Sequence, residues 1–339
     1  MTPRILLLYA DQAVGGVSTI AGTLYRALRQ QDWPITELTL SQCNWRSCWT
    51  AARQCDVILA CHNFKPTYVA WLLGWLLQKP TVVWVHGPLQ EVLAQAHTSA
   101  IKKAWLRWLY RRIPQFVFVS RASRDSFARF MRRPLAAQQG VAVIPNVVAW
   151  TDQAASPVRQ QHAPVASRLA YVGRLSEEKQ PELLLDMLRL LPPEFQLTLL
   201  GDGPASKAVR QSGADLLACG RLTLADPQAH GPDLYRPWNL TLLASRYEGC
   251  PMALLESFAA GVPCVGLPID ALRELLGSDA PYLLAREHSA QALADAVQAV
   301  CAMPRRRVQA DMARVLERHQ LQDFVQQWQR VLQEAACPN

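Results

Sequence analysis

Short apolar runs alternate with amphipathic stretches along almost the whole chain. One series of runs predicts strands within the first 150 residues, and a second series begins at residue 168. We expect the strands at 4–9, 35–40, 56–61, 81–85, 116–119 and 141–144, and then at 168–172, 196–200, 215–219, 240–244 and 263–267. Helical spacing of apolar residues lies between most of these runs. Such alternation is typical of parallel sheets covered by helices.

A polar stretch without periodicity, residues 150–167, separates the two series and contains two prolines. It is expected to be a linker. We therefore predict an α/β protein of two doubly wound, Rossmann-like domains that face a cleft, residues 1–149 on the acceptor side and residues 168–318 on the nucleotide-sugar side. Apolar side chains recur at helical spacing near the end of the chain, so residues 319–339 are expected to form a helix that packs back toward the N-terminal domain.

Length and composition are those of an ordinary folded protein. Half of the 339 residues are hydrophobic, which is enough for two cores. The longest apolar run, residues 68–77, is too short to cross a bilayer. It is expected to be a buried helix, with shallow insertion into a membrane surface as the alternative. No N-terminal signal is visible, so we expect a cytoplasmic protein.

Charge is distributed unevenly along the chain. Residues 1–150 carry a net charge of +11 and residues 151–339 a net charge of −3. Ten basic residues and one acid lie in 101–133, with Trp105 and Trp108 between them. This pattern predicts a surface that meets anionic lipid on the cytoplasmic face of the inner membrane, and a solvated helix face is the alternative. A nucleic-acid-binding protein would also use such a basic face, but no stacking sheet or known binding module accompanies it.

Ligands of open parallel sheets bind beyond the carboxyl ends of the strands, so the loops that follow the strands are the expected places for a binding site. Gly15 and Gly16 follow the first strand and precede a helix, where bare N–H groups can approach an anion. The pair is also compatible with a simple turn. The motifs G-x-G-x-x-G and G-x-x-x-x-G-K-[ST] are both absent, which counts against dinucleotide-binding enzymes and phosphate-loop ATPases.

The segment VGRLSEEKQP, residues 172–181, follows the first strand of the second series. Gly173 lets the chain turn, and Arg174 and Lys179 flank a helix start that Ser176 is expected to mark. Both cations can point at one anion above the sheet, because arginine grips phosphate oxygens bidentately and lysine supplies a point charge. The alternative is a surface pair neutralised by neighbouring glutamates.

The segment SRYEGCPMALLESFAAG, residues 245–261, places two glutamates around a second helix start. Pro251 suits the first helical turn, which leaves the N–H groups of Met252 and Ala253 free to bind phosphate. Acids would repel that phosphate, so Glu248 and Glu256 should face hydroxyl groups instead. A ligand with phosphates at its centre and hydroxyls at both ends is a nucleoside diphosphate sugar.

These motifs resemble the retaining glycosyltransferases of family 4, which have the two-domain GT-B fold. The similarity runs in order over nearly the whole chain. The segments that carry it are GG (15–16), WVHG (84–87), VSRAS (119–123), VIPNV (143–147), YVGRLSEEK (171–179), LLGDGP (199–204), LACGRL (217–222) and SRYEGCPMALLESFAAGVPCV (245–265). The last segment contains the family's Glu, seven residues, Glu motif.

The resemblance implies a role for each matching residue. Gly16 would contact the donor diphosphate, and Arg174 and Lys179 would stabilise the diphosphate as it departs. Glu256 would bind the ribose hydroxyls, and Glu248 would contact the sugar hydroxyls and orient the reacting ring.

Other matching residues are implied to line the donor. His86 would lie beside the sugar, although a strand-end histidine with a structural role is the alternative. The loop at Arg221 and Leu222 would border the nucleobase through backbone atoms. The backbone at Gly249, Cys250, Pro251, Met252 and Ala253 would lie against the sugar and the phosphate. Many family members have an aromatic residue and Gly at positions 250 and 251, so the resemblance does not define the sugar.

The implied reaction transfers a hexose with retention from a nucleotide sugar, with UDP as the expected nucleotide, to a glycan or a lipid-linked glycan of cell-surface polysaccharide or lipopolysaccharide. The catalytic residues would be Glu248, His86, Arg174 and Lys179. No D-x-D motif occurs, and no metal cofactor is expected because the cations would stabilise the leaving diphosphate. A sugar-nucleotide epimerase or hydrolase of similar fold is the alternative.

Overall fold

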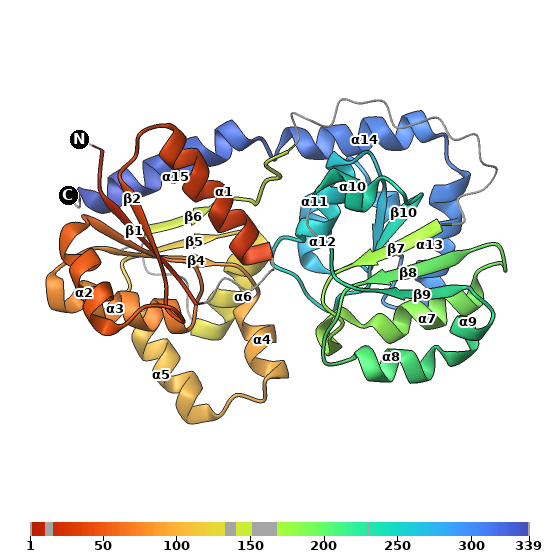
Figure 1. Ribbon diagram of the computed structural model, residues 1–339, viewed down its shortest axis with the longest axis horizontal. Helices are drawn as coiled ribbons and strands as arrows, with labels where there is room; N and C mark the ends of the chain where they lie inside the picture. Colours follow the sequence, from red (N-terminus) through yellow and green to blue (C-terminus); the bar gives the residue numbers. More distant parts are fainter. Residues whose placement is uncertain (1, 11–15, 133–139, 151–167, 229–230, 338–339) are drawn as a thin grey trace. The chain divides into compact units, whose positions relative to one another are not determined.

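The computed structural model divides the chain into two compact units (Figure 1). The described residues are 2–10, 16–132, 140–150, 168–228 and 231–337. The first unit comprises Met1–Val147 together with Leu321–Asn339, and the second comprises Val148–Gln320. Residues 151–167, which the sequence predicts to be a linker, lie outside the described residues.

The first unit is built on a parallel sheet of six described strands in the order β2-β1-β3-β4-β5-β6. The strands are β1 (Ile5–Tyr9), β2 (Ile35–Thr39), β3 (Val57–Ala60), β4 (Thr81–Val85), β5 (Gln115–Phe118) and β6 (Gly140–Val143). β1, β3 and β4 are buried along their whole length. Parallel strands covered on both faces read as continuous apolar runs, which explains why the hydrophobic pattern predicts them well.

Helices cover both faces of this sheet. They are α1 (Gly16–Gln30), α2 (Trp45–Gln54), α3 (Lys65–Leu77), α4 (Leu89–Gln95), α5 (Ala100–Tyr110), α6 (Arg121–Met131) and α15 (Leu321–Ala336). Figure 1 shows α1 and α15 along one face and α2, α3 and α5 along the other. Trp84 of β4 points to the first face, where its ring centroid lies 4.5 Å from that of Trp328 in α15. The C-terminal helix therefore completes the core of the first unit.

The second unit has a parallel sheet of five described strands in the order β11-β10-β7-β8-β9. The strands are β7 (Arg168–Val172), β8 (Gln196–Leu200), β9 (Leu222–Ala225), β10 (Leu240–Leu243) and β11 (Cys264–Gly266). Alternate residues of β7 enter two different clusters: Leu169 and Tyr171 pack with α7, whereas Ala170 packs with Tyr235 of α10. Both faces of the second sheet are therefore covered.

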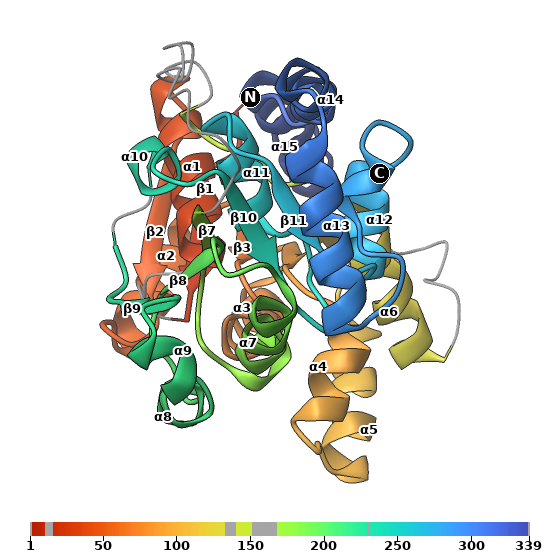
Figure 2. The ribbon, with the colours of Figure 1, turned by 90° about the vertical axis from the view of Figure 1, so that its right-hand side faces the viewer.

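Eight described helices and two 3-10 turns surround the sheet of the second unit. They are α7 (Pro181–Leu190), α8 (Ser206–Ser212), α9 (Ala214–Ala218), α10 (Pro232–Tyr235), α11 (Met252–Ala259), α12 (Asp270–Leu276), α13 (Ala290–Ala302) and α14 (Arg305–Glu317), with 3-10 turns η2 (Glu177–Lys179) and η3 (Pro281–Leu283). The longest of these helices are α13 and α14. α13 lies beside α7 and β11 (Figure 2). β11, β10 and β7 end at the same edge of the sheet as β8, and this edge positions the candidate site described below.

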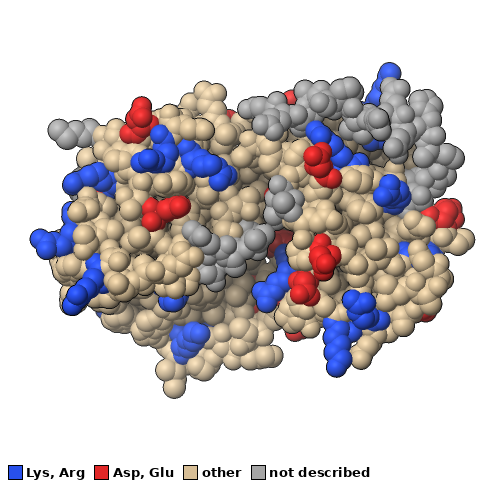
Figure 3. All heavy atoms as spheres, in the orientation of Figure 1, with Lys and Arg blue, Asp and Glu red and all other residues tan. Residues whose placement is uncertain are grey.

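Charge differs between the two units, as the sequence predicts. On the face drawn in Figure 3, basic side chains predominate over acidic ones on the first unit, whereas the two signs are mixed on the second. No helix within the described ranges is long and apolar enough to pass through a bilayer. The run 68–77 lies in α3, but Trp75 and Leu76 are 63% and 45% exposed. The expectation that the whole run is buried is therefore wrong, because only one face of α3 packs on the sheet.

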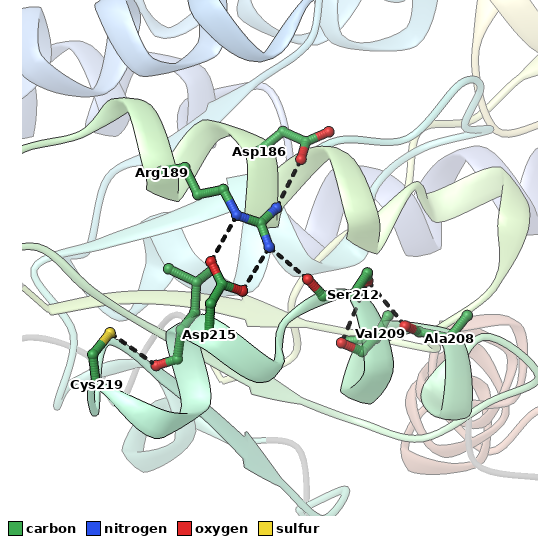
Figure 4. Close-up of polar contacts among 8 residues, drawn as sticks. Asp186, Arg189, Ala208, Val209, Ser212, Asp215 and Cys219 are labelled. Atoms are coloured by element: carbon green, nitrogen blue, oxygen red, sulfur yellow. Dashed lines mark hydrogen bonds and ion pairs between the residues drawn. The ribbon is translucent and has the colours of Figure 1, made fainter.

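The apolar run at residues 215–219 is a helix and not the predicted strand. It forms α9, and the next strand of the sheet is β9, which begins at Leu222. Arg189 of α7 binds the Asp215 carboxylate in the first turn of α9 through Nε at 3.0 Å and Nη2 at 2.8 Å, and the Asp186 carboxylate through Nη1 at 2.9 Å (Figure 4). Arg189 also donates to the carbonyl of Ser212 at the end of α8. One guanidinium thus ties three helices together.

Candidate functional site

The loop after β7 carries Arg174 to the carboxyl edge of the second sheet. Gly173 has a φ of +152°, and Gly201, in the loop after β8, has a φ of +151°. A Cβ on Gly201 would lie 1.9 Å from the carbonyl oxygen of Gly173, and a Cβ on Gly203 would lie 2.3 Å from that of Leu175. The two loops can therefore pack closely only because glycine occupies these positions.

Arg174 itself is exposed, but its backbone is fixed. The Tyr171 hydroxyl donates a hydrogen bond of 2.8 Å to the Arg174 carbonyl. Burial, with further contributions from Glu248 and Glu178, raises the pKa of Tyr171 well above its usual value, so the hydroxyl stays protonated. No described residue forms a hydrogen bond or ion pair with the Arg174 guanidinium. This cation is available to a ligand at the edge of the sheet.

Lys179 and Glu248 form an ion pair across this edge. The Lys179 Nζ lies 2.5 Å from Glu248 Oε1, and the two side chains are 25% and 13% exposed. The same carboxylate oxygen accepts a hydrogen bond of 2.6 Å from Ser245. The N–H of Arg246 donates to the carbonyl of Glu178 at 2.8 Å, which joins the loop after β10 to η2. The structure thus brings together two predicted site residues that are 69 positions apart in the sequence.

The helix start near Lys179 differs from the prediction. Residues 177–179 form the 3-10 turn η2, and α7 begins only at Pro181. Ser176 does not cap this turn through its side chain; its hydroxyl instead donates to the Glu178 carboxylate at 2.6 Å. Lys179 therefore ends a short turn, from which its side chain reaches Glu248.

The start of α11 presents free backbone donors. Pro251 immediately precedes the helix, whose first residue is Met252. The N–H groups of Leu254 and Leu255 bond to the Pro251 carbonyl, whereas no described residue accepts a hydrogen bond from Met252 or Ala253. These two N–H groups carry the partial positive charge of a helix N-terminus. Gly249, which is buried, and Cys250 form the turn that leads into this helix.

Glu256 lies in the second turn of α11 and is only 1% exposed. Its Oε2 accepts a hydrogen bond of 2.5 Å from the hydroxyl of Tyr235 in α10. Burial and the neighbouring carboxylate raise the pKa of Tyr235 far above its usual value, so Tyr235 remains a donor. A buried carboxylate is otherwise rare, and this bond explains how the structure accommodates one.

The structure corrects the prediction for Arg221 and Leu222. Leu222 is the first residue of β9 and pairs with Leu197 near the start of β8, so both residues lie at the amino edge of the sheet. The Arg221 guanidinium donates to the carbonyls at the end of α7 and in the loop that follows it. These acceptors are Leu188, Leu191, Pro192 and Phe195. Arg221 therefore has a structural role, on the edge opposite to Arg174.

Two predicted residues belong to the first unit. Gly16 is the first residue of α1, and His86 follows β4, so both lie at the carboxyl edge of the first sheet. Gly15 lies outside the described residues. The Nε2 atom of His86 is buried and has no hydrogen-bond partner among the described residues. Burial, with a smaller contribution from His62, lowers the pKa of His86 well below its usual range, so the imidazole is neutral at pH 7.

Several residues of the site escaped sequence analysis. Tyr171, Tyr235 and Ser245 each hold a predicted site residue through a hydroxyl group. Ser245 lies three residues before Glu248, a local spacing that offered a signal, whereas Tyr235 is 21 residues from Glu256 and offered none. Within the ranges that the structure describes, no three His, Cys, Asp or Glu side chains are grouped as metal ligands.

Family models match both parts of the chain. The model described as Glycosyltransferase Family 4 matches residues 37–149, and the model described as Glycosyl transferases group 1 matches residues 166–303. The second match contains Arg174, Lys179, Glu248 and Glu256.

Bacterial glycosyltransferases are among the relatives that match part of the chain. The amylovoran biosynthesis glycosyltransferase AmsK of Erwinia amylovora is 31% identical over 144 residues, which cover 39% of this chain and 35% of AmsK. The lipopolysaccharide 1,6-galactosyltransferase of Escherichia coli (strain K12) is 33% identical over 107 residues, which cover 28% of each chain. The matched part of the chain thus spans about a third of the length of these relatives.

Solved structures share the whole fold. Anabaena HepE, crystallised with UDP and glucose, superposes with a TM-score of 0.79 at 19% identity, over 98% of this chain and all of HepE. A glycosyltransferase from Rickettsia africae superposes with a TM-score of 0.73 at 14% identity, over 99% of both chains. The chain therefore belongs to the glycosyltransferases of the GT-B fold, with a Glycosyltransferase Family 4 segment before a group 1 glycosyl transferase segment.

Proposed function

We propose that this glycosyltransferase transfers a hexose from a UDP-sugar, with retention of configuration, to a hydroxyl of a glycan or lipid-linked glycan in the synthesis of bacterial polysaccharide or lipopolysaccharide. The observation that carries the proposal is the cluster at the carboxyl edge of the second sheet. There an unpaired Arg174, the pair Lys179–Glu248 and the free N–H groups of Met252 and Ala253 gather on adjacent loops. The names of the bacterial relatives support the class of acceptor, and HepE in complex with UDP supports the nucleotide.

The diphosphate is assigned to the positive part of this cluster. Arg174 can bind phosphate oxygens bidentately, and the start of α11 offers two N–H donors. Lys179 is held by Glu248. A diphosphate that attracts Lys179 would release one oxygen of Glu248, which could then accept a hydrogen bond from a sugar hydroxyl. Binding of the nucleotide and orientation of the sugar are coupled in this way.

The two ends of the donor are assigned to carboxylates and to the neutral histidine. Glu256 is held by Tyr235 through one oxygen, and we assign its carboxylate to the ribose hydroxyls. His86 supplies a buried Nε2 that lacks a described partner, which suits a sugar hydroxyl. A neutral imidazole also avoids repulsion with the positive charge that grows on the sugar ring.

The proposed chemistry uses charge stabilisation. As the glycosidic bond breaks, negative charge grows on the diphosphate, where Arg174, Lys179 and the start of α11 stabilise it. The acceptor hydroxyl attacks from the same face, and the departing diphosphate oxygen takes its proton. These cations would do the work of a metal ion, so we propose metal-independent turnover. Activity that is retained in EDTA would support this part, and activity restored only by a divalent cation would refute it.

A membrane is the proposed location of the acceptor. Residues 101–133 include α6 and all of α5 except its first residue, Ala100. α5 follows the cap Ser99 and exposes Trp105 and Trp108, each by 42%. Basic helices with exposed tryptophans bind anionic lipid surfaces. We therefore propose a peripheral association with the cytoplasmic face of the inner membrane, where lipid-linked glycans are available.

A thermal-shift panel of nucleotide sugars tests the proposal. We expect at least one UDP-sugar to stabilise the wild-type protein, and Glu256→Gln to require a higher concentration for the same shift, since a neutral amide binds ribose hydroxyls less well. The glutamine retains an acceptor for Tyr235, which limits any loss of stability. If no nucleotide sugar stabilises the wild type, the donor site is wrongly assigned. Release of UDP or a new sugar isomer without any acceptor would favour a hydrolase or an epimerase.

A further inference from the structure

A pocket of about 640 Å³ lies between α3 and α5 on the first unit. Three tryptophans, Trp71, Trp75 and Trp108, line it together with Lys79 and Arg112. The volume is that of an ordinary ligand site. Thr81 begins β4 and Pro114 immediately precedes β5, and both line the pocket, so it lies at the amino edge of the first sheet. His86 lies at the other end of β4, and the pocket is therefore distinct from the donor site.

The walls of the pocket are aromatic and held in place. The rings of Trp71 and Trp75 are nearly parallel, with centroids 6.5 Å apart, and Trp108 meets Trp71 edge-on at 5.4 Å. Gly74 lies behind them, where a Cβ would be 2.3 Å from the Thr81 hydroxyl. Only glycine allows α3 to approach β4 this closely.

Both cations can serve a ligand. The Arg112 guanidinium lies 3.9 Å from the centre of the Trp108 ring and donates one hydrogen bond, of 2.8 Å, to the Trp108 carbonyl. The ammonium group of Lys79 has no hydrogen-bond partner among the described residues. The Asp56 carboxylate attracts it electrostatically but forms its salt bridge with Arg4. An anion in the pocket would meet two cations and no unpaired acid.

The helices beside the pocket, α3 and α5, expose apolar side chains and carry no acid. Of the eight large hydrophobic side chains that are exposed in the described residues, five belong to α3 and α5, which lie on the same face of the first sheet (Figure 1). These five are Trp75, Leu76, Ile101, Trp105 and Trp108. Residues 57–90 and 92–124 contain neither Asp nor Glu. Exposed tryptophans with lysine and arginine and without acids match the interface of an anionic bilayer in both polarity and charge.

We propose that this pocket binds the phosphate headgroup of an anionic phospholipid, with Arg112 and Lys79 on the phosphate and Trp75, Trp108 and Ile101 inserted at the level of the acyl chains. The proposal rests on the peripheral membrane association proposed above and adds a defined headgroup site to it. The occupant is a lipid in a bilayer, because the exposed apolar rim would gain nothing from a free phosphate ion in water. Membrane binding then depends on particular residues and not only on the total charge.

Co-flotation with vesicles tests this inference, using phosphatidylcholine alone and an equimolar mixture of phosphatidylcholine and phosphatidylglycerol. Arg112→Gln is compared with Arg111→Gln, because the neighbouring Arg111 is exposed, does not line the pocket and carries the same charge. Trp75→Ala is compared with Trp45→Ala, which removes a 48% exposed tryptophan from α2. UDP binding and melting temperature of every variant show that the fold and the donor site remain intact.

The expected result is selective. Arg111→Gln should weaken vesicle affinity by at most about fivefold, the effect of one charge near an anionic surface, whereas Arg112→Gln should weaken it by more than about tenfold. Trp75→Ala should likewise weaken it more than Trp45→Ala. Equal losses within each pair would overturn the pocket while leaving diffuse membrane association intact. If the wild type shows no preference for anionic vesicles, both the pocket and the membrane association are overturned. Sugar transfer to a soluble acceptor is measured separately, and its presence would show that the proposed enzymatic function stands.

A soluble occupant would give a different result. Titration with glycerol phosphate in the absence of vesicles should produce no measurable binding by the wild type. Saturable binding that Arg112→Gln abolishes would overturn the lipid assignment in favour of a small phosphorylated ligand.

Discussion

Replacement of Glu248 by Gln should strengthen the binding of UDP and slow the transfer of the sugar. The Glu248 carboxylate holds the Lys179 ammonium at 2.5 Å. The variant keeps an acceptor for Ser245 but loses the negative charge. Lys179 is then free to bind a phosphate, and the repulsion between the carboxylate and the diphosphate disappears. UDP should therefore bind more tightly, while transfer of the sugar should become slower.

The size of the first effect follows from the burial of the pair. Fully exposed ion pairs contribute at most about 1 kcal/mol, and hydrogen bonds to charged groups about 1.5–3 kcal/mol. Lys179 and Glu248 are 25% and 13% exposed, and glutamine retains part of the hydrogen bonding. We therefore expect a gain of about 1 kcal/mol, or about fivefold in the dissociation constant of UDP. Loss of the contact with the sugar should lower kcat by about 100-fold, or about 2.7 kcal/mol.

Isothermal titration with UDP and steady-state rates of UDP release measure the two effects. Glu182→Gln is the matched control, because Glu182 is exposed in the first turn of α7 and changes the charge of the same unit equally. Lys179→Gln should weaken UDP binding by about tenfold, the reverse of Glu248→Gln. Weaker UDP binding by Glu248→Gln, or an unchanged kcat, would refute the coupling between the two residues.

Three further outcomes follow from the described contacts. Burial lowers the pKa of His86 in the folded protein, so the stability that the neutral imidazole allows is present above the unfolded pKa of about 6.5 and is lost as the pH falls below it. In urea titrations the free energy of unfolding of the wild type should therefore fall between about pH 7.5 and pH 5.5. His86→Gln should show a smaller fall, whereas the exposed control His97→Gln should behave like the wild type. Gly201→Ala should lower the melting temperature and abolish UDP binding, since the new Cβ would lie 1.9 Å from the Gly173 carbonyl oxygen. Gly220 has a φ of +74° and open space around the position of a Cβ, so the control Gly220→Ala should lower the free energy of unfolding by only about 1 kcal/mol. Equal melting temperatures of the two variants would contradict the close approach of the two loops. Arg221→Gln removes the hydrogen bonds to the carbonyls at the end of α7, so it should lower the free energy of unfolding by about 2 kcal/mol and leave UDP affinity within about twofold. A large loss of UDP affinity without loss of stability would show that Arg221 belongs to the donor site.

The strands were largely predictable from the sequence, because strands buried on both faces read as apolar runs. The exception at residues 215–219 shows the limit of that signal. A short run such as Asp-Leu-Leu-Ala-Cys, with four apolar residues of five, has the same appearance in a short helix and in a strand. The structure identifies it as a helix by its backbone hydrogen bonds, such as that from the Cys219 N–H to the Asp215 carbonyl. The error also moved the expected loop: with β9 beginning at Leu222, the residues before it lie at the amino edge of the sheet.

The site was predictable where the chemistry is local and not where it depends on contacts between loops. Spacing and residue type singled out Arg174, Lys179, Glu248 and the start of α11. The pairing of Lys179 with Glu248 joins loops after two different strands, and no periodicity reports it. The segment LLGDGP entered the sequence analysis only as one part of the family resemblance, whereas the structure shows that its glycines give the loop of Arg174 the space that it needs.

Binding of UDP to the wild type, Arg174→Gln and Arg210→Gln is the most direct test of the claim that the carboxyl edge of the second sheet holds the diphosphate of a nucleotide sugar. Arg210 is exposed on α8 and serves as the control for the loss of one positive charge. The account predicts that Arg174→Gln weakens UDP binding by more than about tenfold, the value of a charge-assisted hydrogen bond, and that Arg210→Gln leaves it within about twofold. Equal affinities of all three proteins for UDP, or no binding by the wild type, would contradict it.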